Sequence, residues 1–243
     1  MPKIFEIETE NLENGNDLMS GVNTLKEWFI DGVDTGMKKL KTAKLMFGSC
    51  GNLEYFYDDL SSLANGDSMF INCYKLNTMT TDLTSLETAS HMFVNSNFKK
   101  IYEIPRYPAK IENDYLYLLD GLPKLNYGYK TFHSNITLEE FDVDLPHLEY
   151  GHEMFYGCYE LYNFKSEMPM LYEASHMFNN CHNLTTFNSN LSSLEIAHGM
   201  YDNCYDLNEF TSDLSSLKYA NTMFKSCHNL GSFNVDLSSL ENA

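Results

Sequence analysis

The most reactive side chains of this sequence belong to six cysteines, and all six occupy one position of a repeated pattern. The numbers of Cys50 and Cys73 differ by 23, and the same step separates the four cysteines that begin at Cys158. If equivalent residues stack in neighbouring parallel coils, their Cβ atoms lie further apart than the roughly 3.8 Å that a disulfide prefers. We therefore expect a buried column of reduced thiols made up of Cys50, Cys73, Cys158, Cys181, Cys204 and Cys227.

Histidines adjoin two of these cysteines, and cysteine with histidine can bind zinc. His182 follows Cys181, and His228 follows Cys227. The sequence has neither a C-x-x-C nor an H-x-x-x-H spacing, and adjacent residues of an extended strand point to opposite faces. We therefore expect no metal site and no cofactor.

A second column carries oxygen ligands that could bind calcium between coils. Asn190 lies in this column without a charge, which suits a hydrogen-bonding role better than a calcium site. Asp or Asn at the start of a turn accepts a hydrogen bond from the backbone N–H two residues further on. We therefore expect turn capping rather than calcium at Asp59, Asp82, Asp144, Glu167, Asn190, Asp213 and Asp236.

Serine and threonine are abundant, but the sequence shows no nucleophile with a recognisable base and orienting partner. It also has no glycine-rich phosphate loop. The Ser and Thr residues fall in turns and at outward strand positions, where polar side chains are usual. We predict that the protein is not an enzyme.

These residues belong to a repeat of the form M-F-x-x-C-x-x-L-x-x-F, whose first position falls at Met46, Met69 and Met92 and again from Thr131 onwards in steps of 23. One such unit cannot bury its own apolar face, so it must stack on the next unit. The step from Met92 to Thr131 is 39 instead of 23, which predicts one inserted loop within residues 97–121. We predict an all-β solenoid of about nine short coils over residues 23–243, preceded by an N-terminal cap at residues 1–22.

The unit MFxxCxxLxxFxxxLxxLxxA resembles the short leucine-rich repeats of the BspA-like bacterial surface antigen family, whose typical unit carries A-F-x-x-C-x-x-L-x-x-I. The resemblance covers residues 23–243 and is most specific between the cysteine and the leucine. Methionine replaces the family's alanine, and Leu-Ser-Ser-Leu replaces its proline-containing turn. The resemblance implies a right-handed leucine-rich solenoid with a parallel sheet on its concave side, and a role in adhesion or protein recognition rather than catalysis.

The composition narrows the choice of partners. The 243 residues include 34 acidic and 16 basic side chains, a formal charge of −18 that disfavours nucleic acid and anionic membranes. No apolar run approaches the roughly 18 residues of a membrane-spanning helix. The first twenty residues lack a basic start followed by an apolar stretch, so we expect cytoplasmic synthesis, with assembly into a virion or at a cell surface.

Three surfaces are candidates for binding a partner. The first, the sheet face, holds residues between the inward Leu and Phe positions, namely Tyr55, Tyr57, Thr78, Thr80, Glu140, Asp142, Asn163, Lys165, Thr186, Asn188, Glu209 and Thr211. The second, the insertion surface, combines basic residues and tyrosines, which suit interfaces, at Lys99, Lys100, Tyr102, Arg106, Tyr107, Lys110, Tyr115 and Tyr117. The third, the tyrosine flank, is a partly apolar stripe interrupted by Glu173 and formed by Tyr127, Tyr150, Ile196 and Tyr219.

Each surface also has a structural explanation that requires no partner. The sheet face could simply be solvated, the tyrosines could pack the insertion onto its own coil, and the flank could be covered by a loop.

We predict a non-catalytic scaffold with a protein partner, within a larger assembly such as a phage virion or tail or a cell-surface apparatus. The alternative is a free-standing adhesin that binds a host protein or a glycan through the concave face. We also expect another chain or further sequence to cover the last coil.

Overall fold

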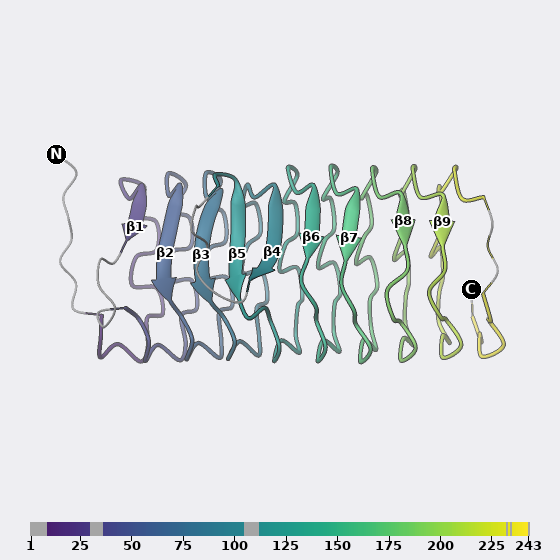
Figure 1. Cartoon of the computed structure of the whole chain (residues 1–243), viewed down its shortest axis with the longest axis horizontal. Helices are drawn as coiled ribbons and strands as arrows, with labels where there is room; N and C mark the ends of the chain where they lie inside the picture. The colour runs from purple at the N-terminus through teal and green to yellow at the C-terminus, as the bar shows by residue number, and fades with distance from the viewer. Residues whose placement is uncertain (1–8, 30–35, 105–111, 232, 234, 243) are drawn as a thin grey trace.

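The computed structural model describes residues 9–29, 36–104, 112–231, 233 and 235–242. Within these residues the chain contains no helix, and its strands lie in a single row along the long axis (Figure 1). The strands are β1 (Glu27–Phe29), β2 (Tyr55–Asp59), β3 (Thr78–Asp82), β4 (Lys100–Ile104), β5 (Tyr115–Leu119), β6 (Glu140–Asp142), β7 (Asn163–Lys165), β8 (Thr186–Phe187) and β9 (Glu209–Phe210). This arrangement confirms the predicted all-β repeat solenoid.

All paired strands are parallel, and the pairing follows the sequence repeat. Phe56 pairs with Met79, and Phe141 pairs with Phe164. β1 to β7 form one sheet, and β8 pairs with β9. The opposite edge of the solenoid is a column of single β-bridges that joins Asn14, Thr42, Asn65, Thr88, Tyr127, Tyr150, Glu173, Ile196, Tyr219 and Asn242.

The core consists of columns of identical or similar side chains. The rings of Phe47 and Phe70 stack with centroids 5.4 Å apart and planes within 4°, and the same stacking continues from coil to coil as far as Tyr201 and Phe224. The cysteine column runs beside it: all six thiols are free, and five are buried. Because one coil supplies only one member of each column, stacking of neighbouring coils supplies the hydrophobic burial.

In the turns that return the chain to the sheet, backbone N–H groups alternate between two kinds of acceptor, one in the next coil and one in the same turn. The N–H groups of Leu45 and Phe47 donate to the next coil, whereas that of Met46 donates within its own turn. This alternation places Leu45 and Ser49 in the left-handed region, at φ 56° and 60°, and equivalent residues of later coils share it. Left-handed backbone strains most residues other than glycine, so the pairing with the next coil must offset that strain.

The column of single β-bridges begins at Asn14, before the sequence repeat becomes recognisable. Asn14 forms a bridge with Thr42, so the first step is 28, longer than the usual 23. Trp28 is buried in β1, and its Nε1 donates a hydrogen bond to Asp58 Oδ2 at 2.9 Å. Part of residues 1–22 therefore forms a partial turn of the ladder, and their role as a cap stays a prediction.

The insertion adds a strand to the sheet, where the sequence predicted only a loop. The N–H of Asn97 still donates to Leu76 O in the preceding coil, at 2.9 Å. Beyond this point the coils separate: the N–H of Lys99 donates to Asp114 O at 2.6 Å, and the N–H of Asp114 donates to Thr78 Oγ1 at 3.1 Å. β5 therefore lies between β3 and β4, although it follows β4 in the chain.

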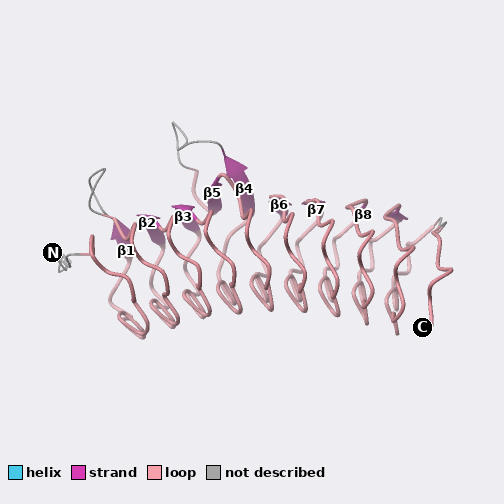
Figure 2. Ribbon diagram, turned by 90° about the horizontal axis from the view of Figure 1, so that it is seen from below, coloured by secondary structure: helices cyan, strands magenta, loops and turns pink. Residues whose placement is uncertain are grey.

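The extra strand also changes the shape of the sheet. On the opposite edge Thr88 bridges directly to Tyr127, so the inserted strand has no counterpart there. Figure 2 shows the row of strands rising towards β4 and β5 and falling away on both sides. The sheet is therefore convex in this region, which corrects the concave sheet that the family resemblance implied.

Candidate functional site

The most closely connected polar network on the sheet face is centred on the carboxylate of Glu140 in β6. Lys100 Nζ, from β4, lies 2.6 Å from Glu140 Oε1. Tyr102, also from β4, donates its hydroxyl to Oε2 at 2.8 Å, and Tyr162, just before β7, donates to Oε1 at 2.7 Å. The side chains of Lys100 and Glu140 are 23% and 16% exposed, so the pair is largely shielded from water.

This geometry favours the ionised forms of Glu140 and Lys100. The hydrogen bond from Lys100, helped by those from Tyr162 and Tyr102 and opposed by partial burial, lowers the pKa of Glu140 to about 2. The same bond raises the pKa of Lys100. Partial burial and the bond to Glu140 raise the pKa of Tyr102 to about 12. The network therefore holds one positive and one negative charge in fixed positions at neutral pH.

The tyrosines of the insertion surface surround this network. Tyr102 and Tyr115 meet edge to face with centroids 5.8 Å apart, and Tyr115 meets Tyr117 in the same way at 5.8 Å. Lys100 Nζ lies 5.7 Å from the centre of the Tyr115 ring. Because strand pairing and these contacts fix the rings, their conformational freedom is already low.

The structure thus brings together most of the predicted insertion surface and one part of the sheet face. Tyr117 is an exception: it is buried at 7% exposure, so it does not form the accessible binding surface that the sequence predicted. Lys99 forms an ion pair with Asp114 at 3.2 Å. In register with the network, Asp142, Asn163 and Lys165 continue the same face across β6 and β7. Tyr55 and Tyr57 lie on β2, separated from β4 by two strands. Arg106, Tyr107 and Lys110 lie outside the described residues.

Two threonines of the predicted sheet face are not accessible. Thr78 and Thr80 in β3 are fully buried, although the sequence pattern predicted that they face solvent. Tyr57 and Tyr117 occupy the paired positions on either side of Thr80. Large side chains on both neighbouring strands cover a small one between them, which the alternation of inward and outward positions does not take into account.

The tyrosine flank is also assembled as predicted, with one additional member. The rings of Tyr127 and Tyr150 stack with centroids 4.7 Å apart and planes within 5°. Tyr172 meets Tyr150 edge to face at 6.1 Å. Sequence analysis missed Tyr172 because it stands one position before the flank column, where Glu173 interrupts the aromatic residues. Ile196 and Tyr219 continue the ladder beyond Glu173.

The predicted turn caps are confirmed at most positions of the acidic column. Asp59 accepts a hydrogen bond from the N–H of Ser61 at 2.9 Å, and equivalent bonds occur at Asp82, Asn190, Asp213 and Asp236. The pattern differs at Asp144 and Glu167, whose carboxylates accept from an N–H of the next coil, at 2.9 Å in both cases.

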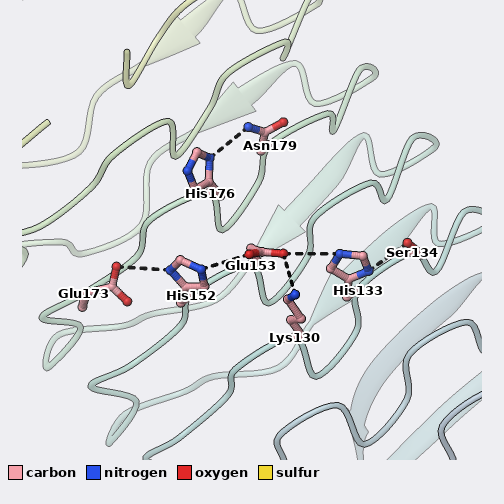
Figure 3. Close-up of polar contacts among 8 residues, drawn as sticks. All are labelled: Lys130, His133, Ser134, His152, Glu153, Glu173, His176 and Asn179. Atoms are coloured by element: carbon pink, nitrogen blue, oxygen red, sulfur yellow. Dashed lines mark hydrogen bonds and ion pairs between the residues drawn. The ribbon is translucent and has the colours of Figure 1, made fainter. Parts of the chain in front are cut away.

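A cluster that sequence analysis did not predict lies along the turns between successive coils (Figure 3). Glu153 is at its centre: Lys130 Nζ and His133 Nε2 lie 3.2 and 3.4 Å from Oε2, and His152 Nε2 lies 3.0 Å from Oε1. His152 Nδ1 is also 3.6 Å from Glu173. Lys130 and Glu153 share one column position in consecutive coils, so the repeat itself contained the signal for this cluster.

Burial opposes protonation of one histidine in this cluster. It is the main cause that lowers the pKa of His133; the charge of Glu153 acts in the opposite direction, and that of Lys130 lowers the pKa further. Although burial alone would raise the pKa of Glu153, hydrogen bonds from Lys130 and His152 lower it. At neutral pH the cluster therefore contains an ionised glutamate between a lysine and uncharged His133.

With the neighbouring Ser134, this cluster contains a serine, a histidine and a carboxylate connected in a row, which is the arrangement of a hydrolase triad. Ser134 Oγ lies 2.8 Å from His133 Nδ1, and the other ring nitrogen faces Glu153. Acyl transfer also needs hydrogen-bond donors for the developing oxyanion. The N–H of Ser134 already donates to Tyr156 O at 2.8 Å, so it is not free for that role. The arrangement therefore gives no support for a hydrolase.

Neither a metal-binding cluster nor a membrane-spanning helix occurs within the described ranges. There, no group of three or more His, Cys, Asp or Glu side chains is arranged to hold a metal ion. In the same part of the chain, no helix has the length and apolar character needed to cross a membrane.

Comparison with known proteins gives one family match. The family described as "BspA type Leucine rich repeat region (6 copies)" matches residues 37–120 and 126–242. No curated protein matches the sequence. A similar solved structure is a leucine-rich repeat protein from Bacteroides ovatus, which is 16% identical over 94% of this chain and 77% of that chain, with a TM-score of 0.43. The family match thus includes coils on both sides of the insertion.

Proposed function

The chain belongs to the BspA type leucine-rich repeat family, and from this premise we propose that it is a non-catalytic scaffold that binds a protein partner through the described part of the insertion surface together with the neighbouring Glu140 and Tyr162. Leucine-rich repeat proteins commonly mediate protein interactions, which supports a scaffold role in general terms. The observation that carries the proposal is the network of Lys100, Tyr102 and Tyr162 around Glu140.

The physical argument concerns the entropy of binding. Association normally loses affinity when flexible side chains become ordered at the interface. Here the tyrosines and the charged pair are already held by hydrogen bonds and ring contacts, while Tyr162 remains 43% exposed. Tyrosine also combines an apolar ring with a hydrogen-bonding group, which suits the centre of an interface.

A photo-crosslinking experiment tests this proposal. A benzoylphenylalanine at Lys165, exposed on the sheet face, should capture the partner, whereas the same residue at exposed Lys225, on the turn side, should not. With the purified partner, Tyr162→Ala should weaken binding by about tenfold. Tyr159→Ala is the matched control, because Tyr159 is also 43% exposed. Equal losses in both variants, or crosslinking only from residue 225, would contradict the proposal.

We further propose that the partner belongs to a larger assembly, such as a virion or tail or a cell-surface apparatus. A free-standing adhesin is the rival explanation. The identity of the crosslinked protein separates the two: a structural protein encoded by the same genome supports an assembly component, and a host protein supports an adhesin.

A further inference from the structure

The tyrosine flank borders two shallow grooves that the proposed protein interface does not use. One groove, of about 490 Å³, is lined by residues that include Tyr150, Tyr172 and Glu195. The other, of about 460 Å³, includes Tyr127 and Asn126. Because Tyr127 and Tyr150 stack on each other between them, the two grooves form one strip along the solenoid axis.

This strip is lined by exposed apolar side chains and by hydrogen-bonding groups. Exposed apolar surface comes from Tyr127, Met170 and Tyr172, which are 46%, 44% and 37% exposed. Beside it lie carboxylates and hydroxyls, and Ser193 Oγ donates to Pro169 O at 2.7 Å, which leaves its lone pairs free to accept. A sugar ring has apolar C–H faces and a rim of hydroxyls that both donate and accept. Exposed aromatic rings next to such polar groups therefore match a saccharide.

The charge of the strip limits the kind of saccharide. Glu149 and Glu195 line the first groove, and Lys218 Nζ already lies 2.7 Å from Glu195. The second groove is lined by both Glu87 and Lys124. The balance is acidic, so sulfated sugars and uronic acids are repelled. Carboxylates do accept hydrogen bonds from the hydroxyls of neutral sugars.

The backbone of the strip disfavours a peptide ligand. The N–H groups of Glu195 and Ile196 both donate to Tyr172 O, and those of Lys218 and Tyr219 both donate to Glu195 O. An added peptide strand needs unpaired backbone groups at a sheet edge. Here the contacts available to a ligand come from side chains.

We propose that the tyrosine flank, together with Tyr172, binds a neutral oligosaccharide chain that lies along the solenoid axis. The length of the strip favours an extended chain over a single sugar, because its lining residues come from coils between Glu87 and Ser216. This site is separate from the insertion surface, so either proposal can fail without the other.

Calorimetric titration of the full chain tests the proposal. The probes are cellohexaose, chitohexaose and mannohexaose, with an oligogalacturonate of the same length as the charged comparator. We expect saturable binding of at least one neutral probe and none of the oligogalacturonate. Tyr172→Ala should weaken binding by about tenfold. Tyr205→Ala, at a site 39% exposed on another edge, should leave the affinity unchanged.

A second variant distinguishes the loss of a sugar contact from a folding defect in Tyr172→Ala. Glu149→Gln keeps the shape of the groove and should also weaken binding, with an unfolding midpoint close to that of the parent. The proposal is overturned if no neutral glycan binds in titration or on a glycan array. It is equally overturned if the oligogalacturonate binds as tightly, or if only a peptide ligand occupies the flank.

Discussion

The thiol of Cys181 donates a hydrogen bond to the carbonyl oxygen of Phe155, 3.2 Å away in the preceding coil. The N–H of Cys158 donates to the same oxygen at 3.2 Å, so one carbonyl links its own turn to the next coil. The same thiol contact occurs at every cysteine of the column. The cysteines are therefore donors within the repeat as well as apolar core residues.

This arrangement predicts how the thiols react. Burial raises the pKa of Cys181 well above its usual value, and it raises the pKa of Cys227, which is only partly buried, to about 11. Since the thiolate is the reactive form, iodoacetamide at pH 8 should label Cys227 first and Cys181 only after unfolding. Peptide mass spectrometry measures both rates, with the guanidinium-unfolded chain as the control. Rapid labelling of Cys181 in the folded chain would contradict the burial of this column.

Replacing Tyr201 by phenylalanine should stabilise the protein. Tyr201 is fully buried in a column that otherwise consists of phenylalanines, and its Oη has no hydrogen-bond partner among the described residues. Removing an unsatisfied buried hydroxyl should raise the free energy of unfolding by about 1 kcal/mol. Urea denaturation measures the change, and Phe178→Tyr, one coil earlier, should have the opposite effect. A destabilised Tyr201→Phe would mean that the hydroxyl is satisfied in solution.

The Glu140 network should make stability depend on pH in the acid range. The pKa of Glu140 falls from 4.5 to about 2 on folding, so its stabilisation is present above pH 4.5 and is lost as the pH falls towards 2. Glu140→Gln should lower the free energy of unfolding at pH 7 by about 1 kcal/mol. Below pH 4.5 the difference in the free energy of unfolding between Glu140→Gln and the parent protein should decrease. Urea denaturation at pH 7, 4 and 3 tests this, and a constant difference would rule out the network as its source.

His133 should contribute a separate pH dependence, closer to neutral. Burial lowers its pKa in the folded state below the ordinary 6.5, so unfolding takes up a proton as the pH falls through that value. Stability should therefore decrease from pH 7 to pH 5. His133→Asn, which copies Asn179 at the same position two coils later, should reduce this decrease. Exposed His228→Asn is the control, and equal effects of both variants would refute the assignment.

A glycine at Thr222 should stabilise the last coils. Thr222 is an exposed β-branched residue at φ 58°, and Gly199 holds the same position one coil earlier at φ 55°. Thr222→Gly should raise the free energy of unfolding by about 1 kcal/mol by relieving left-handed strain. Gly199→Thr should reduce it, because a Cβ there would lie 2.6 Å from His176 Nδ1. Thermal unfolding of both variants measures the two shifts.

The repeat period was sufficient to predict the coils and the cysteine column. It did not predict that Lys100 and Tyr102 meet Glu140, because the sequence assigned the first two to the insertion surface and Glu140 to the sheet face. It did not predict β5, because the period describes only contacts between consecutive coils, and β5 pairs out of chain order. Tyr162 and Tyr172 were missed for a related reason, since each stands one position away from the column to which it contributes. The Glu153 cluster was missed because Lys130 and Glu153 share one column whereas His133 and His152 belong to two others, and a column taken by itself does not show contacts between columns.

The position of β5 has a consequence for synthesis on the ribosome. A solenoid can grow by adding each new coil to the one already formed, because its contacts are with immediate neighbours. β4 leaves the ribosome before β5, yet its place in the finished sheet is on the far side of β5. Coil-by-coil growth must therefore wait at β3 until residue 119 has emerged, or β4 must first attach to β3 and then be displaced.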